Sequence, residues 1–350
     1  AVGAKAGTAV TTGLKNNLLG GLAGDALTTG SNNVAIGYEA LTSEDTGSRN
    51  IAIGQSALGS LNYDGNGYNI AIGHNTGVSV TTGVQNTLIG GLAGDALTTA
   101  SFNVAIGYSA LSTEDENGRN IAIGYFALNA QDAGTDAYNV AIGFKAGENI
   151  TTGIKNTIIG GQAGDALTTA TENTVIGYEA LTDATTCNYN TVLGTQAMKV
   201  GQNANRNTAI GFQALYNITQ SSALDTYNVA VGYAAGGQMT TGTENIIIGG
   251  LAGDALTTGS LNVAMGHGAL GAEDTGSANV AIGYKALNDL NNDGSSVNVA
   301  VGYLSGEKIT TGTRNTLIGG LTGDALTSGY YNTALGYQAL SASVSGRNAV

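Results

Sequence analysis

The chain has 350 residues, including 56 glycines and neither proline nor tryptophan, and its 12 basic and 25 acidic residues give a net charge of −13. An apolar fraction of 42% with only 11% charged residues excludes an intrinsically disordered chain, and the absence of proline excludes collagen. We expect no nucleic-acid partner, because an acidic surface repels phosphates. We also expect no membrane insertion, because no apolar run approaches the ~20 residues that span a bilayer.

One phrase, seen first as NNVAIGYEAL at 32–41, recurs nineteen times between Asn16 and Asn332. Each copy is a rung, numbered from its Asn as position zero. Of the eighteen intervals between these asparagines, fourteen are 17 residues, three are 19 and one is 21. Position four is always Gly, and positions one to seven alternate with the period of a strand. Because so short a unit cannot bury a face alone, the pattern predicts an all-β, parallel β-solenoid or β-roll of about 19 rungs.

Rungs with a second Gly at position five occur at regular places along the chain. They begin at 16, 86, 156, 245 and 315, which divides the chain into four-rung blocks, one of them with a fifth rung. The blocks predict a single continuous repeat domain over 1–350. Neither AVGAKAG at 1–7 nor GRNAV at 346–350 resembles the polar cap of a solenoid. We therefore expect a piece of a longer array, or a subunit that stacks end to end.

Each block has one lengthened rung whose extra residues are polar, at 61–68, 129–138, 216–227 and 288–297. Segments rich in Asn, Asp, Gly and Ser are expected to protrude as loops. If the protein has a receptor, we expect contacts from the loop residues Tyr63, Asp64, Asn66, Asp132, Asp136, Asp225, Asn292 and Asp293.

The invariant residues of the phrase are interpreted as structural, as in Asn33, Ile36, Gly37, Asn103, Ile106, Gly107, Asn279, Ile282 and Gly283. The Asn is expected to form a ladder or to occupy a left-handed turn position, and the Gly to allow close backbone approach. Position six varies freely, as in Glu39 and Lys145, so it is expected to face solvent. In the rungs with two glycines, a large position two coincides with Gly at position five, as in Leu88 and Gly91, which indicates an exchange of volume within one packed layer.

Residues that could carry chemistry are few. His74 and His267 replace the Tyr that usually occupies position five, and neither lies near a Cys or Ser that would complete a catalytic arrangement. We therefore expect no enzyme and no cofactor. Asp289, Asn291 and Asp293 copy the opening of a calcium loop but lack its final Glu, so they are weak calcium candidates and no metal is expected.

Other polar groups have simpler interpretations. Acidic clusters such as Glu44-Asp45 and Glu114-Asp115-Glu116 are interpreted as solvated turns, and the Asp of the double-glycine rungs, as in Asp95, as a partner of turn N–H groups. Threonine pairs such as Thr81-Thr82 and Thr98-Thr99 should stack, which raises an ice-binding alternative. Their column lapses for two rungs in every block, whereas an ice face needs an unbroken array.

The phrases RNTAIGFQAL at 206–215 and YNTALGYQAL at 331–340 resemble the β-roll shaft repeats of phage tail-fibre-type proteins, and are similar to the head repeats of trimeric autotransporter adhesins. The resemblance covers nearly the whole chain. It implies a left-handed parallel β-roll, three chains around one axis and an extracellular attachment role, with matrix contacts near Asn33 to Gly37 and Asn103 to Gly107. The rung is longer than that of the adhesin heads, and one residue is missing between its Asn and Gly.

The leading hypothesis is a non-enzymatic fibre segment, a homotrimeric shaft or adhesin head on a virion or cell surface. Its strands are apolar or small on both faces, so one face of a lone chain would be exposed, and sister chains would cover it. Its receptor would be a cell-surface glycan or protein. The alternative is a subunit of an extracellular filament that stacks rung to rung. A glycan-cleaving fibre is less favoured, because no acidic pair marks a cleft.

Overall fold

The computed structural model describes residues 1–342 and 344–347, in two compact units, 1–172 and 173–350. Each unit is built from parallel strands that recur about every 17 residues. The predicted all-β, parallel β-solenoid is therefore confirmed. The expectation of one continuous domain over 1–350 stays a prediction. The described residues contain no helix, and so none that could cross a membrane.

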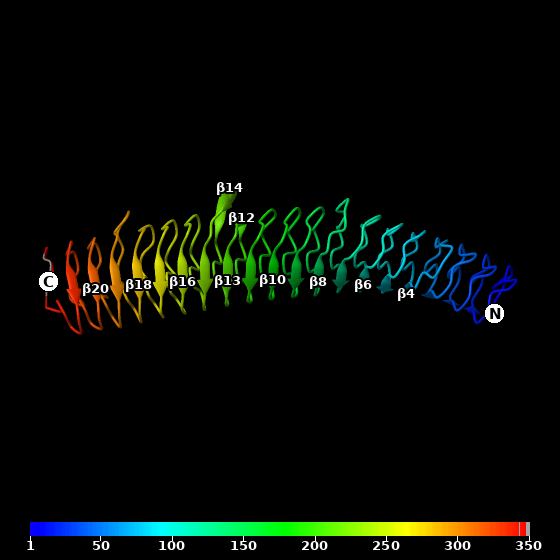
Figure 1. Ribbon diagram of the computed structural model, residues 1–350, viewed down its shortest axis with the longest axis horizontal. Coiled ribbons are helices and arrows are strands. Elements are labelled where there is room, and N and C mark those ends of the chain that lie inside the picture. Colours follow the sequence, from blue (N-terminus) through cyan, green and yellow to red (C-terminus); the bar gives the residue numbers. More distant parts are fainter. Residues whose placement is uncertain (343, 348–350) are drawn as a thin grey trace. The chain divides into compact units, whose positions relative to one another are not determined.

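Unit 1 stacks nine strands, one per rung (Figure 1): β1 (Asn17–Leu19), β2 (Val34–Ile36), β3 (Ile51–Ile53), β4 (Ile70–Ile72), β5 (Thr87–Ile89), β6 (Val104–Ile106), β7 (Ile121–Ile123), β8 (Val140–Ile142) and β9 (Thr157–Ile159). Consecutive strands pair in parallel and in register. Val34 of β2, for example, is the partner of Asn17 in β1 and of Ile51 in β3. Equal positions of the repeat therefore form columns along the unit.

Unit 2 stacks ten such strands: β10 (Thr174–Ile176), β11 (Thr191–Leu193), β13 (Thr208–Ile210), β15 (Val229–Val231), β16 (Ile246–Ile248), β17 (Val263–Met265), β18 (Val280–Ile282), β19 (Val299–Val301), β20 (Thr316–Ile318) and β21 (Thr333–Leu335). A second, two-stranded sheet pairs β12 (Gln202–Asn205) with β14 (Thr219–Asp225) in parallel (Figure 1). The segment 216–227, expected to be a loop, therefore contains a strand.

The strands are shorter than the alternation of the phrase predicts, because each ends at position three. Gly37 at position four has φ of 135°, and a Cβ there would lie 2.4 Å from the carbonyl oxygen of Gly54 in the next rung. Position six is left-handed, with φ of 56° at Glu39, and so is position eight, with φ of 55° at Leu41. These conformations turn the chain after three extended residues. The expected close approach at the invariant Gly is thus present.

The left-handed backbone at position six excludes β-branched residues, a restriction that is missed when only invariant residues are sought. Position six holds Leu, Glu, Ser, Asn, Phe, Lys, Gln, Ala or Gly, but never Val, Ile or Thr. A β-branched side chain is strained at positive φ, so its absence follows from the backbone. At position six the polarity of the side chain therefore varies, but the residue is never branched at Cβ.

The Asn column is a hydrogen-bonded ladder inside the solenoid. Oδ1 of Asn16 accepts the backbone N–H of Asn33 at 2.9 Å, and Oδ1 of Asn33 accepts that of Asn50 at 2.9 Å. Nδ2 of Asn33 donates to the carbonyl oxygen of Gly47 at 2.8 Å, across the interior of its own rung. Of the two roles expected for this Asn, the ladder is the one observed, and it is the preceding residue, Asn32, that has positive φ.

The interior is lined by position two, position seven and a large apolar residue at position eight or eleven. Position two is usually Ala, as in Ala35, and becomes Leu or Ile where position eight is Gly both in the same rung and in the preceding one. Cβ atoms built on Gly77 and Gly94 would lie 2.6 and 2.9 Å from the side chain of Leu88. One large residue thus fills the space left by two glycines in adjacent rungs. The expected exchange between Leu88 and Gly91 is wrong, because position five faces outward.

Position five, and not position six, is the exposed one. The side chain of Tyr38 is 52% exposed, and that of Tyr303 is 56% exposed. Position six is half-buried in most rungs, as at Glu39 and Lys145. The expectation that position six faces solvent is therefore wrong for most rungs. The left-handed backbone there turns the side chain along the surface instead of away from it.

We predict that Asn33→Ala destabilises its rung by roughly 2–4 kcal/mol, because it leaves the buried N–H of Asn50 and the carbonyl of Gly47 without partners. Hydrogen exchange is the suitable measurement, because stacked repeats open locally. Protection should fall in residues 33–50, while the exposed-loop control Asn66→Ala leaves it unchanged. Equal protection in both variants would contradict the role of the ladder.

Candidate functional site

The residues expected to contact a receptor lie in four separate rungs, and most of them are held by the preceding rung. Asp64 accepts a hydrogen bond from Thr46 at 2.7 Å, and Asp293 accepts one from Thr275 at 3.0 Å. Asp136 forms an ion pair with Arg119 at 2.8 Å, and Asp225 one with Arg206 at 2.8 Å. Asp64, Asn66, Asp132 and Asp293 are exposed, whereas Tyr63, Asp136, Asp225 and Asn292 are half-buried. The loops are therefore fixed extensions of the rungs.

The weak calcium candidates have separate partners. Asp289 lies 3.5 Å from Nζ of Lys308, and Asp293 accepts the hydroxyl of Thr275. The backbone N–H of Asn291 donates to Thr310, and its side chain is exposed. The polar groups of this segment bond to residues of the neighbouring rungs, and these three candidates do not converge on a shared ligand position.

Three glutamates at position eleven are fully buried, which corrects the interpretation of these pairs as solvated turns. Oε1 of Glu44 accepts the N–H of Gly47 at 2.6 Å, and Oε2 accepts that of Tyr63 in the next rung at 3.2 Å. Glu273 repeats this arrangement with Gly276 at 2.7 Å and Asn292 at 3.3 Å. Burial raises the pKa of each carboxyl, although these N–H groups oppose the shift. The third is Glu114.

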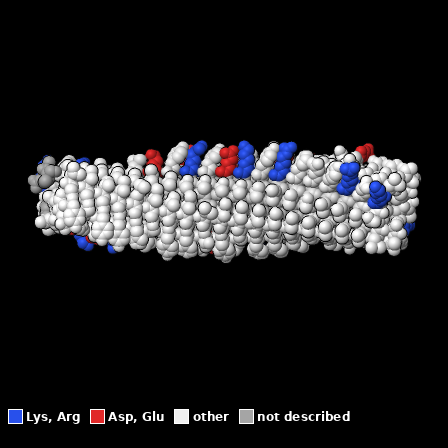
Figure 2. All heavy atoms as spheres, turned by 60° about the horizontal axis from the view of Figure 1, so that its bottom comes forward, with Lys and Arg blue, Asp and Glu red and all other residues white. Residues whose placement is uncertain are grey.

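A flat neutral face is formed in each unit by positions one, three and five. Positions one and three point outward and are partly exposed, whereas position two is buried, as along Val104–Ile106. No rung has Asp, Glu, Lys or Arg at positions one, three or five. Figure 2 shows a broad surface without charged side chains, with Lys, Arg, Asp and Glu gathered along its border. In a chain with net charge −13, this face lacks the repulsion that keeps copies apart.

Aromatic rings form a ladder along the border of the neutral face. Tyr125 stacks on Tyr108 at 5.6 Å and on Phe144 at 5.4 Å between ring centroids. In unit 2, Tyr284 stacks on His267 at 5.8 Å and on Tyr303 at 5.5 Å. His267 thus occupies an aromatic place in the column, as its position in the repeat predicts.

In four of the five double-glycine rungs, the Asp at position nine is followed one rung later by a residue with a hydroxyl. Oδ1 of Asp25 accepts the hydroxyl of Thr42 at 2.6 Å, and Ser112 occupies the corresponding position after Asp95. The interpretation of these aspartates as partners of turn N–H groups missed this hydroxyl. At Asp254 the corresponding residue is Gly271, so the hydroxyl is missing. Burial raises the pKa of Asp254, while its own N–H and His267 oppose the shift.

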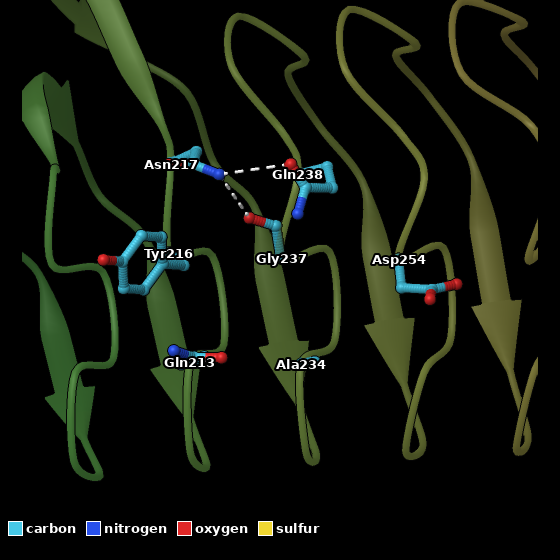
Figure 3. A pocket seen from close by; sticks show the side chains of 7 residues that line it. All are labelled: Gln213, Tyr216, Asn217, Ala234, Gly237, Gln238 and Asp254. Atoms are coloured by element: carbon cyan, nitrogen blue, oxygen red, sulfur yellow. Dashed lines mark hydrogen bonds between the residues drawn. The ribbon is translucent and has the colours of Figure 1, made fainter.

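A hollow opens beside Asp254, because the next rung also has Gly268 at position six, where no other rung has Gly. The cavity has a volume of about 310 Å³ and is lined by Asp254, His267, Lys285 and Asn288 among others. Asp254 also lines a second cavity of about 320 Å³ (Figure 3). We call the two together the Asp254 hollow. The sequence already indicates the Asp254 hollow, because one rung has Gly268 at position six and Gly271 at position nine.

Planar amides and rings surround the second cavity. Asn217 Nδ2 donates to the carbonyl of Gly237 at 3.2 Å and to Oε1 of Gln238 at 3.4 Å (Figure 3). Tyr216 and Gln213 complete this side. Amide and carboxylate groups pair with hydroxyls, and a ring offers an apolar surface, so the Asp254 hollow suits a small polyhydroxylated ligand.

The single cysteine offers no chemistry at the surface. Cys187 is fully buried, and burial raises the pKa of its thiol to about 12. A thiol that stays protonated is a poor nucleophile and a poor metal ligand.

Neither a scan against protein-family models nor a search of curated proteins found a match to this chain. The fold therefore defines the class as a parallel β-solenoid with a rung of about 17 residues.

We predict that Glu273→Gln changes how stability depends on pH. Because the pKa of Glu273 is raised in the folded state, the folded chain binds this proton more tightly, and its free energy of unfolding rises as pH falls toward the ordinary Glu range near ~4.3. The melting temperature of the parent chain, relative to that of the variant, should therefore increase between neutral pH and about pH 5. The exposed-residue control Glu244→Gln should show the parent's profile, and an identical profile for Glu273→Gln would refute the assignment.

Proposed function

We propose that this chain is a structural and adhesive fibre segment, a homotrimeric shaft or head that rigidly displays attachment surfaces outside the cell. The neutral face carries this proposal, because a parallel stack of β-branched and aromatic side chains without one charge suits contact with other copies. The resemblance to phage tail-fibre shafts and trimeric adhesin heads supports the same assignment. A virion or a cell surface would be its location, and no catalysis is proposed.

The size of the neutral face agrees with an interface. Strands about 4.8 Å apart give each unit a length of roughly 40 Å, and three columns give a width of about 10–15 Å. That is roughly 500 Å² of face per unit, near the largest apolar patch that monomers expose. The face of one unit is thus more than half of the ~800 Å² per partner of a stable interface. Sister copies are the occupants that match it, because they offer the same charge-free columns.

Two other roles are less favoured. Ice binding would need free hydroxyls, whereas Thr81 Oγ1 donates to the carbonyl of Thr98 at 3.2 Å, and Thr98 Oγ1 donates to that of Asp115 at 3.1 Å. A glycan-cleaving fibre would need a pair of carboxylates across a cleft, and Asp254 is the one carboxylate that lines the Asp254 hollow. A filament that grows rung to rung is the alternative from the same structural class.

The attachment surface of this fibre is proposed to include the Asp254 hollow, with a cell-surface glycan as its ligand. Gly271 is the one residue without a hydroxyl among the five that follow a position-nine Asp by one rung, and Gly268 is the one Gly at position six. Neither glycine has the close backbone contact that explains the glycine at position four. Hydroxyl-pairing groups at Asp254, Lys285 and Asn288, beside the ring of His267, suit a pyranose.

We predict that the parent chain has the mass of three copies by light scattering, and that Val104→Lys with Val280→Lys weakens association by roughly 100-fold or more. Each lysine would place an unpaired charge in a buried contact. The control, Ser60→Lys, adds the same charge away from the neutral face and should leave the mass unchanged. A parent chain that is monomeric at micromolar concentration would contradict the proposal, and open-ended fibres in electron micrographs would favour the filament.

We predict that the parent chain gives saturation-transfer NMR signals with members of a panel of neutral and acidic mono- and disaccharides at millimolar concentration. Gly271→Ser should abolish them, because it restores the hydroxyl beside Asp254 and fills the hollow. Gly59→Ser makes the same change at position nine of a rung that does not follow an Asp, and should bind as the parent does. The glycan assignment fails if no sugar gives a signal, or if Gly271→Ser binds equally well.

A further inference from the structure

The buried glutamates at position eleven form three niches of the same design, each followed by a lengthened rung. Two of them begin with the tetrapeptide Glu-Asp-Thr-Gly, at 44–47 and 273–276, and the third reads Glu-Asp-Glu-Asn, at 114–117. Position twelve of the following rung is Asn62 or Asn291 in the first two niches and Asp132 in the third. The third niche therefore has two more carboxylates than its counterparts, Glu116 and Asp132.

The first two niches are complete without a ligand. Both oxygens of Glu44 accept backbone N–H groups, and so do both oxygens of Glu273. A Cβ on Gly47 or Gly276 would lie within 2.5 Å of the glutamate carboxylate. A glycine at this position therefore leaves the space that the buried carboxylate occupies.

The third niche is incomplete. Glu114 is fully buried, and its Oε1 accepts the N–H of Asn117 at 3.1 Å. Its Oε2 is buried and has no hydrogen-bond partner among the described residues, in contrast to Oε2 of Glu44 and Glu273. The counterpart N–H, that of Ala133, faces this carboxyl and favours its charged form, but forms no hydrogen bond of normal geometry with it.

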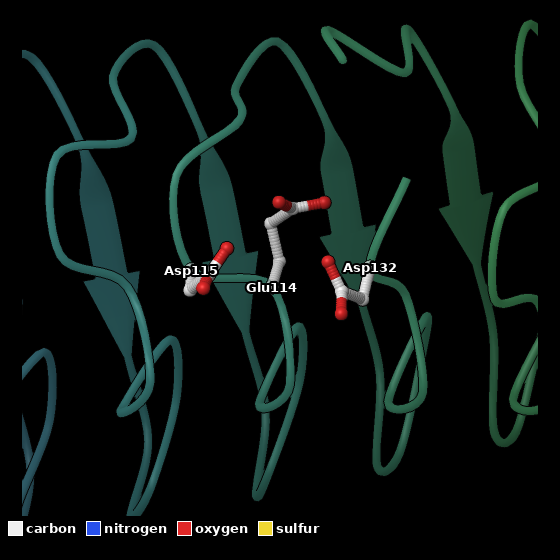
Figure 4. Close-up of side chains that lie close together, drawn as sticks. All are labelled: Glu114, Asp115 and Asp132. Carbon is white, nitrogen blue, oxygen red and sulfur yellow. The ribbon is translucent and has the colours of Figure 1, made fainter. Parts of the chain in front are cut away.

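Two further carboxylates lie beside that of Glu114. One oxygen each of Glu114, Asp115 and Asp132 lie within 4.8 Å of one another, and Figure 4 shows the Glu114 side chain extended between the other two. Asp132 is exposed, so water reaches the outer side of the cluster. The nearby cation Arg119 is paired with Asp136 at 2.8 Å and donates to the hydroxyl of Tyr138 at 2.7 Å. Three carboxylates thus lie together, one of them with an unsatisfied buried oxygen, and no described ion pair neutralises them.

We propose that Glu114, Asp115 and Asp132 bind one divalent cation, and that this cation is Ca²⁺. Calcium takes oxygen ligands at about 2.3–2.6 Å, so two ligands on opposite sides of the ion are at most about 5 Å apart, which the cluster satisfies. The donors are all carboxylates, with neither His nor Cys, which disfavours zinc. Open access at Asp132 leaves room for the waters that would complete the coordination shell.

The ion would join two rungs. Glu114 and Asp115 belong to the rung of Asn103, whereas Asp132 begins the lengthened segment of the rung of Asn120. Bound calcium would therefore fix the base of the loop 129–138, which carries the receptor-contact candidates Asp132 and Asp136. The other two niches achieve the same junction with backbone hydrogen bonds.

Titration calorimetry with CaCl₂ tests the proposal on the full chain after chelator treatment. We expect one ion per chain with a dissociation constant on the order of 10⁻⁴ M, typical of extracellular calcium modules. Asp132→Asn places at position twelve the Asn of the two counterparts, so it should fold, and its affinity should fall at least ~10-fold. Asp64→Asn removes one charge from an exposed loop and should bind as the parent does.

Hydrogen exchange supplies a second measurement. Calcium should increase protection within 114–117 and 129–138 in the parent chain and leave Asp132→Asn unchanged. No binding at millimolar calcium would overturn the proposal, and so would equal binding by the parent and Asp132→Asn. Magnesium binding as tightly as calcium would overturn the choice of ion.

Discussion

The asparagine at position zero is the interaction on which the rest of each unit depends. Its Oδ1 accepts an N–H from the next rung, while in the 17-residue rungs its Nδ2 closes its own rung by donating to a carbonyl fourteen residues later, as Asn33 does with Asn50 and Gly47. One amide therefore fixes both the rise between rungs and the diameter of each rung. An Asp has no donor for the second bond, and a Gln is too long by one methylene, which is why nineteen copies retain this residue.

Small residues set the remaining dimensions. Gly37 and its counterparts let the carbonyl of the next rung approach where a Cβ would clash, and the left-handed positions six and eight bend the chain back toward the interior. The interior is then so narrow that a residue as large as Leu88 fits at position two only where its own rung and the preceding one both have Gly at position eight. The four-rung block is thus a packing period, in which two adjacent glycines share one large side chain.

The sequence predicts the rung, the parallel stacking and the inward Ala columns well, because a 17-residue spacing with invariant Asn and Gly admits few other arrangements. Alternation continues through Tyr38 and Ala40, so the pattern also predicts strand where the backbone is left-handed. The burial of Glu44 was missed because charged residues are rarely buried and its two N–H partners lie in different rungs. The Asp254 hollow forms where one rung differs in sequence from the others, and a search for residues that all rungs share overlooks such differences.

The lengthened rungs differ from the others by two or four residues, and never by one or three. The ladder Asn after each of these insertions is still buried, as Asn69, Asn139, Asn228 and Asn298 show. The turn between position eleven and the next Asn is therefore a place where peptides of even length can be grafted without disturbing the solenoid. Because neighbouring rungs lie about 4.8 Å apart, the spacing between two such grafts could be chosen in steps of about 5 Å.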